Sequence, residues 1–161
     1  MAVNDDARVM AAGMAPTPFT ADEIRHGCPP GRITHLRTTT LGEPTITHIT
    51  KFLTNDADGG TTEGWAVDES GGEIEPVTVS TFLWTDLQAH ASFPVSSTEI
   101  SSATIQIELG TFDCHRYVVT RDETVSTFWF AVDLPGMPIR FSTEIGGRTV
   151  STATLIANEM P

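Results

Sequence analysis

The stretch from residue 110 to residue 158 constrains the fold of this chain more strongly than any other part of it. Runs rich in apolar and β-branched residues are separated here by Pro135-Gly136 and by Gly146-Gly147. A Gly-Gly pair between two such runs favours a tight I′ or II′ hairpin turn, and connections this short make neighbouring strands antiparallel. The C-terminal half is therefore predicted to form an antiparallel meander. Its five strands are expected at 103–109, 112–121, 124–133, 139–145 and 148–157.

The N-terminal half carries further strand signals, because Thr, Val and Ile are frequent there and suit a pleated, half-buried surface. A hairpin of two strands is predicted around the turn at residues 41–44, and two more strands should follow it. These four strands are expected at 32–40, 45–55, 61–69 and 74–79.

Two short helices are predicted among the strands. The first is expected at 20–27, where the opening residues fit a capping box and a glycine closes the last turn. The second, of about three turns, is expected at 80–92, because Leu83, Leu87 and His90 recur at helical spacing.

These elements define a mainly β (α+β) fold. We expect one curved antiparallel sheet, a half-barrel or barrel of about eight to ten strands, with two short helices. The 161 residues fit one domain of this kind, at 19–161. Residues 1–18 lack any periodic pattern and are expected to be a flexible or loosely docked N-terminal arm.

Charge and composition exclude several classes of partner. The net charge of −12 repels phosphate backbones, so nucleic acid is not an expected partner. No stretch approaches the roughly 20 apolar residues that span a bilayer, so membrane insertion is not expected. The N-terminal residues do not resemble a secretory signal, which predicts a cytoplasmic location. Cys28 and Cys114 are too few for a disulfide scaffold, and two separate thiols are expected in a reducing compartment.

The strand at 124–133 is apolar on both faces, since Phe128 and Phe130 alternate with Trp129 and Ala131. A strand of this kind must be covered on both sides. One cover can be a helix, and the other can be a sheet that curves around an apolar cavity, where β-barrels hold small molecules. A central strand between two ordinary core layers is the alternative.

Several motifs of this region resemble a recurring pattern in bacterial proteins of the lipoprotein-carrier-like (LolA-like) half-barrel class. The matching segments are Gly110 to Cys114, Tyr117, Thr127 to Phe130, and Leu134 to Arg140, within residues 103–157. The resemblance implies a curved antiparallel sheet, partly closed by helices, around an apolar groove that holds acyl chains or other hydrophobes.

Candidate ligand-binding residues come from this strand and from the second helix. They are Phe128, Trp129, Phe130, Trp84, His90 and Arg140. Arg140 alternates with the apolar Ile139 and Phe141, so it either binds a ligand carboxylate at the mouth of the groove or faces solvent.

Histidines suggest chemistry at two places. His90 shares the apolar stripe of the second helix and should face the sheet, as a core histidine or, paired with Asp86, as an acid or base. His35 and His48 fall opposite one another if the first hairpin turns symmetrically, which would supply two ligands of a metal site, although no third ligand is evident. No metal or other cofactor is therefore predicted, and no nucleophile elbow, phosphate loop or HExxH motif is present.

Three functions follow from these observations. The first is binding of a small hydrophobic or amphipathic, lipid-like molecule in an apolar groove of the sheet. The second is protein interaction or homodimer formation, with the Thr-rich first hairpin as a free sheet edge. The third is an isomerase, cyclase or hydrolase that uses the same cavity with His90 as acid or base.

Overall fold

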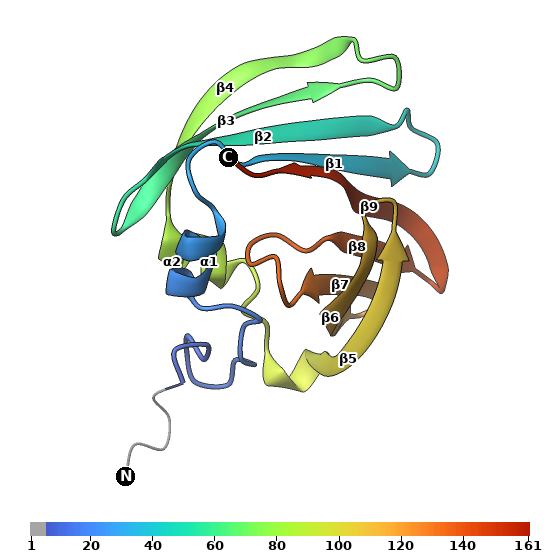
Figure 1. Cartoon of the computed structure of the whole chain (residues 1–161). Coiled ribbons are helices and arrows are strands. Elements are labelled where there is room, and N and C mark those ends of the chain that lie inside the picture. The colour runs from blue at the N-terminus through green and yellow to red at the C-terminus, as the bar shows by residue number, and fades with distance from the viewer. Residues whose placement is uncertain (1–5) are drawn as a thin grey trace.

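A computed structural model describes residues 6–161 as one curved antiparallel sheet of nine strands with two short α-helices (Figure 1). The strand order is β4-β3-β2-β1-β9-β8-β7-β6-β5, so the sheet is open and β4 and β5 form its edges. The predicted fold class is therefore confirmed. The elements are α1 (Ala21–Gly27), β1 (Ile33–Thr40), β2 (Ile46–Asn55), β3 (Gly59–Val67), β4 (Glu73–Leu83), α2 (Trp84–Ala89), η1 (Val95–Ser97), β5 (Thr98–Ile107), β6 (Gly110–Arg121), β7 (Thr124–Ala131), β8 (Arg140–Ile145) and β9 (Arg148–Glu159).

The two helices lie together inside the curve of the sheet, at one end (Figure 1). Helix α1 begins as predicted, with Thr20 as N-cap: its side chain accepts from the backbone of Glu23, whose carboxylate accepts from the backbone of Thr20. Within residues 6–161 no helix has both the length and the apolar character needed to cross a membrane.

The predicted extent of the second helix is wrong. Residues 80–83 belong to β4, where they pair with residues 59–62 of β3, and α2 contains six residues, Trp84–Ala89. Pairing between strands overrides a short helical pattern here, because the pairing satisfies backbone groups that a helix of this length would leave open. The side chains that α2 buries most deeply are Trp84 and Gln88, four residues apart.

The register of the first hairpin differs by one residue from the symmetric arrangement. His35 pairs with Ile49 and His48 pairs with Leu36, because the turn is centred on Gly42, which has a φ of 78°. A one-residue shift moves a side chain to the other face of the sheet, so the two histidines do not form a pair. The expected free edge at this hairpin is also wrong, since β1 lies between β2 and β9 and β2 between β1 and β3.

The C-terminal meander is confirmed, and Gly146 and Gly147 make its last turn with φ angles of 59° and 78°. The tip of the β5–β6 hairpin reaches back to β1, where Arg37 Nη2 lies 2.6 Å from Glu108 Oε1.

A second core forms under this hairpin, and Ala131 and Trp129 of β7 belong to it. The two-sided apolar strand is thus covered on one face by the returning hairpin and on the other by the helical side of the protein.

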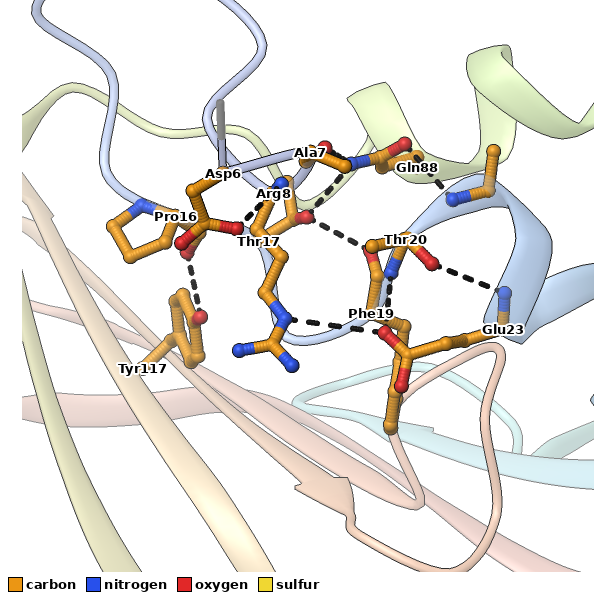
Figure 2. Close-up of polar contacts among 11 residues, drawn as sticks. Asp6, Ala7, Arg8, Pro16, Thr17, Phe19, Thr20, Glu23, Gln88 and Tyr117 are labelled. Atoms are coloured by element: carbon orange, nitrogen blue, oxygen red, sulfur yellow. Dashed lines mark hydrogen bonds and ion pairs between the residues drawn. The ribbon is translucent and has the colours of Figure 1, made fainter. Parts of the chain in front are cut away.

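The segment before α1 is docked on the domain, with hydrogen bonds from residue 7 onward, so its described part is not a flexible arm. Ala15, Thr17 and Phe19 are buried, and the hydroxyl of Tyr117 donates to the carbonyl of Pro16 at 2.7 Å (Figure 2). Burial of the Tyr117 side chain raises the pKa of its hydroxyl to about 12. Residues 1–5 of the predicted arm lie outside the described residues.

Gln88 connects three segments in this region (Figure 2). Its amide nitrogen donates to the carbonyl of Ala7 at 2.8 Å and to the hydroxyl of Thr17 at 3.0 Å, and its oxygen accepts from the backbone of Ala21 at 2.9 Å. The side chain, which is 4% exposed, therefore joins α2 to α1 and to the N-terminal segment through hydrogen bonds.

Replacing Gln88 with alanine is expected to lower the free energy of unfolding by about 1–3 kcal/mol, because buried donors and acceptors are left unpaired. Urea denaturation followed by circular dichroism measures this change. Gln106→Ala is the control, since Gln106 is exposed on edge strand β5 and should change stability by no more than about 0.5 kcal/mol. Equal stabilities of the two variants would contradict the role assigned to Gln88.

Candidate ligand-binding pocket

A cavity of about 630 Å³ lies between the two helices and the sheet. Its volume falls within the roughly 300–1,000 Å³ that is usual for small-molecule sites. Aromatic and aliphatic side chains form most of the wall. The residues that line it are Ile24, Cys28, Arg32, Thr34, Thr50, Phe52, Thr62, Ser80, Phe82, Leu87, His90, Ala91, Phe128, Phe130, Gly136, Met137, Pro138 and Phe141.

Phenylalanines from both halves of the sheet form the apolar wall. Phe128 of β7 stacks on Phe141 of β8 at 5.8 Å between ring centroids. Phe52 of β2 meets Phe82 of β4 edge to face at 6.1 Å. Because these strands are distant in the sheet order, the curvature of the sheet brings the two groups of rings to one space. A wall of this chemistry favours an apolar ligand.

Two polar residues of the wall, Arg32 and Thr34, lie immediately before β1 and at its start. Arg32 is only 2% exposed, and its guanidinium donates to Asn158 Oδ1 at 2.8 Å and to the carbonyls of Gly27 and Pro135 at 3.0 and 3.1 Å. Thr34 is 1% exposed, and its hydroxyl has no hydrogen-bond partner within residues 6–161. A buried hydroxyl without a hydrogen-bond partner lowers the stability of the folded protein, and most buried polar groups therefore have a partner.

Both cysteines are free, as expected, and both are buried. Burial raises the pKa of the Cys28 thiol, and the nearby Arg32 opposes this only in part. Burial, together with the charge of Asp113, raises the pKa of the Cys114 thiol. Protonated thiols are weak nucleophiles, so neither cysteine has the character of a catalytic residue.

The structure brings three of the six predicted ligand-binding residues to the cavity. Phe128 and Phe130 form part of the wall, and the exposed His90 stands at its rim. Trp84 is buried but does not line the cavity, and its indole nitrogen donates to the carbonyl of Asp56 at 2.8 Å.

Trp129 and Arg140 do not line the cavity. Trp129 alternates with the cavity residues Phe128 and Phe130 on β7, and it belongs to the second core. The guanidinium groups of Arg140 and Arg116, on the two neighbouring strands, lie 5.7 and 6.0 Å from the centre of its ring. Arg140 therefore takes part in a cation–π arrangement.

The predicted catalytic pair is not formed. His90 and Asp86 are both exposed, and the contact between them is the backbone hydrogen bond from His90 N–H to the Asp86 carbonyl at 3.3 Å. Because α2 ends at Ala89, His90 lies just beyond the helix and is exposed, so it is not a buried core histidine.

The weak metal candidates are also separated. His35 lies 3.6 Å from the carboxylate of Glu159, and His48 is exposed on β2. Within residues 6–161, no group of three or more His, Cys, Asp or Glu side chains could hold a metal ion.

Sequence reasoning did not identify Arg32, Thr34, Phe52 and Phe82 as cavity residues. Phe82 was assigned to a helix, and the other three lie in the first hairpin, which is remote in sequence from the Trp129 strand. One local signal existed: Arg32 and Thr34 are two residues apart at the start of a strand, so they share a face with the residues that a curved sheet encloses.

No protein-family model and no curated protein sequence matches this chain. Two solved structures share its fold. One is a protein of YmcC-like fold from Bacteroides fragilis that is inferred to be exported, with a TM-score of 0.51 and 8% identity over 81% of this chain and 96% of that one. The other is MucB, solved in complex with MucA(peri), with a TM-score of 0.54 and 13% identity over 83% of this chain. The match spans 51% of the length of MucB.

The expected cytoplasmic location is contradicted by these neighbours: one is described as exported, and MucB was solved in complex with MucA(peri). The prediction was drawn from the pattern of the N-terminal residues alone.

Proposed function

We propose that this protein binds a small hydrophobic or amphipathic molecule in the cavity between the helices and the sheet. The observation that carries the proposal is the cavity itself: about 630 Å³, lined by phenylalanines from four strands and by few polar groups. A protein that did not bind a ligand here would gain stability by filling such a space, because empty apolar volume is destabilising.

The resemblance of residues 103–157 to LolA-like carriers supports the same function, since that class holds acyl chains in a half-barrel groove. The two structural neighbours add support for the half-barrel shape and for work outside the cytoplasm. MucB is known in complex with MucA(peri), a protein partner, whereas the cavity of this chain has the size of a small-molecule site.

The hydrophobic dye N-phenyl-1-naphthylamine tests the proposal, because its fluorescence rises in an apolar site. We expect saturable binding by the wild type. Thr50→Phe should weaken it by about tenfold or more, because a phenyl ring would occupy the cavity and displace apolar contacts of the dye.

Thr47→Phe is the matched control. Thr47 is on the same strand and is also half-buried, but it points to the opposite face of the sheet. The affinity of the Thr47→Phe variant for the dye should equal that of the wild type. Absence of saturable binding to the wild type, or equal weakening by both substitutions, would refute the proposal.

A further inference from the structure

Arg32 is a buried cation without an acidic partner. None of the four ion pairs within residues 6–161 includes it, and no Asp or Glu lines the cavity. Its guanidinium donates hydrogen bonds through Nε and Nη1, which leaves Nη2 without a partner among the described residues. Burial of a guanidinium without a counter-charge is costly, and a negatively charged ligand would offset that cost.

Cys28 does not supply the missing negative charge. Its sulfur accepts a hydrogen bond from Arg32 Nη1 at 3.3 Å, so a thiolate at this position would neutralise the guanidinium. Burial raises the pKa of this thiol above its ordinary value, however, and the thiol is protonated at neutral pH. The positive charge at the wall of the cavity is therefore not balanced by the protein.

The unpartnered hydroxyl of Thr34 lies on the same wall. Residues two apart on an extended chain point to the same face, and both Arg32 and Thr34 line the cavity. A hydroxyl donates one hydrogen bond, and a carboxylate accepts several. One anionic group could thus satisfy both residues at once.

The exposure of the lining residues indicates the orientation of a bound ligand. Arg32 and Thr34 are buried, whereas Ser80 and His90, which line the same cavity, are exposed. The phenylalanine wall belongs to the same space as both groups. An anionic head at the Arg32 end would therefore place an apolar chain along the aromatic rings, with its far end toward solvent.

We infer that the cavity selects an anionic amphiphile, a long-chain carboxylate, and holds it head first, with the carboxylate at Arg32 and Thr34 and the chain directed toward Ser80 and His90. This inference rests on the proposed function. The net charge of −12 opposes anion binding only at long range, because exposed charges are screened within about 10 Å, whereas Arg32 acts at contact distance in a poorly solvated site.

A pair of ligands with the same chain tests the inference. The fluorescent fatty acid cis-parinaric acid and its methyl ester differ in the charge of the head group, and each is titrated into delipidated wild-type protein at pH 7.5. We expect the acid to bind at least about tenfold more tightly than the ester, because hydrogen bonds to a charged group are the stronger ones.

Two variants locate the head group. Thr34→Val keeps the shape of the side chain and breaks no hydrogen bond in the structure, so it should fold normally and weaken acid binding by about tenfold, with ester binding unchanged. Thr38→Val, on the same strand but outside the cavity, is the control. Arg32→Met should abolish the preference for the acid. If its circular dichroism shows that it does not fold, the decision rests on Thr34→Val.

The outcomes separate this inference from the proposed function. Equal affinities of wild type for acid and ester, or an acid affinity that Thr34→Val leaves unchanged, would overturn the head-first carboxylate site while leaving apolar binding intact. If the acid, the ester and the naphthylamine dye all fail to bind, the proposed function fails as well.

Discussion

Replacing Phe130 with alanine is expected to lower the free energy of unfolding by about 3–5 kcal/mol, the range for truncation of a buried phenylalanine. Phe130 is 3% exposed and lies at the centre of the aromatic cluster on the helical side of the sheet. Its ring meets Phe19 edge to face at 6.3 Å and Tyr117 at 5.4 Å, and it stacks on Phe128 at 6.1 Å. The substitution would remove these contacts and enlarge a cavity that is already present.

Urea denaturation followed by tryptophan fluorescence measures this loss. Val79→Ala is the control, because Val79 is 65% exposed on the edge strand β4 and should change stability by about 0.5 kcal/mol or less. A loss of under about 1 kcal/mol for Phe130→Ala would show that the aromatic cluster does not form the core of the fold.

Replacing Gly59 with alanine is expected to cost about 3 kcal/mol, at the upper end of the usual range for overpacking. A Cβ at this position would overlap the carbonyl oxygen of Phe82, far inside van der Waals contact. That oxygen belongs to the backbone of β4, which pairs with β3 at this point, so the strands must separate to make room. Because Phe82 also lines the cavity, the change should weaken dye binding as well.

Gly64→Ala is the matched control for this prediction. Gly64 lies on the same strand, and the nearest atom to its added Cβ would be the carbonyl oxygen of Ile49 at 3.5 Å, an ordinary contact. The control should be stabilised by up to about 1 kcal/mol, because alanine loses less backbone entropy on folding than glycine does. Thermal melting compares the two variants, and equal melting temperatures would contradict the close approach of β3 and β4.

Local patterns were enough to predict the parts of the fold that depend on local chemistry. Gly146-Gly147 specified a turn because both residues adopt positive φ, which other residues rarely do. Thr20 and Glu23 specified the start of α1 because their side chains satisfy nearby backbone groups. The alternation of Phe128, Trp129 and Phe130 correctly indicated a strand that is covered on both faces.

The candidate site was predictable only in part, because it is built by contacts between remote segments. Phe128 and Phe130 were identified from their own strand, whereas Phe52 and Phe82 reach the cavity through the curvature of the sheet. The positions of His35 and His48 depended on a single residue of register, which the turn at Gly42 decides. His90 was misplaced because strand pairing shortened the helix before it.

The sequence by itself determined that this protein is a mainly β chain with an antiparallel C-terminal meander, two short helices and an apolar strand in need of cover. Only the tertiary structure decided that the sheet stays open, that α1 and α2 lie within its curve, and that Arg32 and Thr34 lie in the wall of the resulting cavity. The reason is physical: turns, caps and alternation act between neighbours in the chain. The burial of Arg32 and Thr34, and hence the chemistry of the site, depends on side chains up to 126 residues away, such as Asn158.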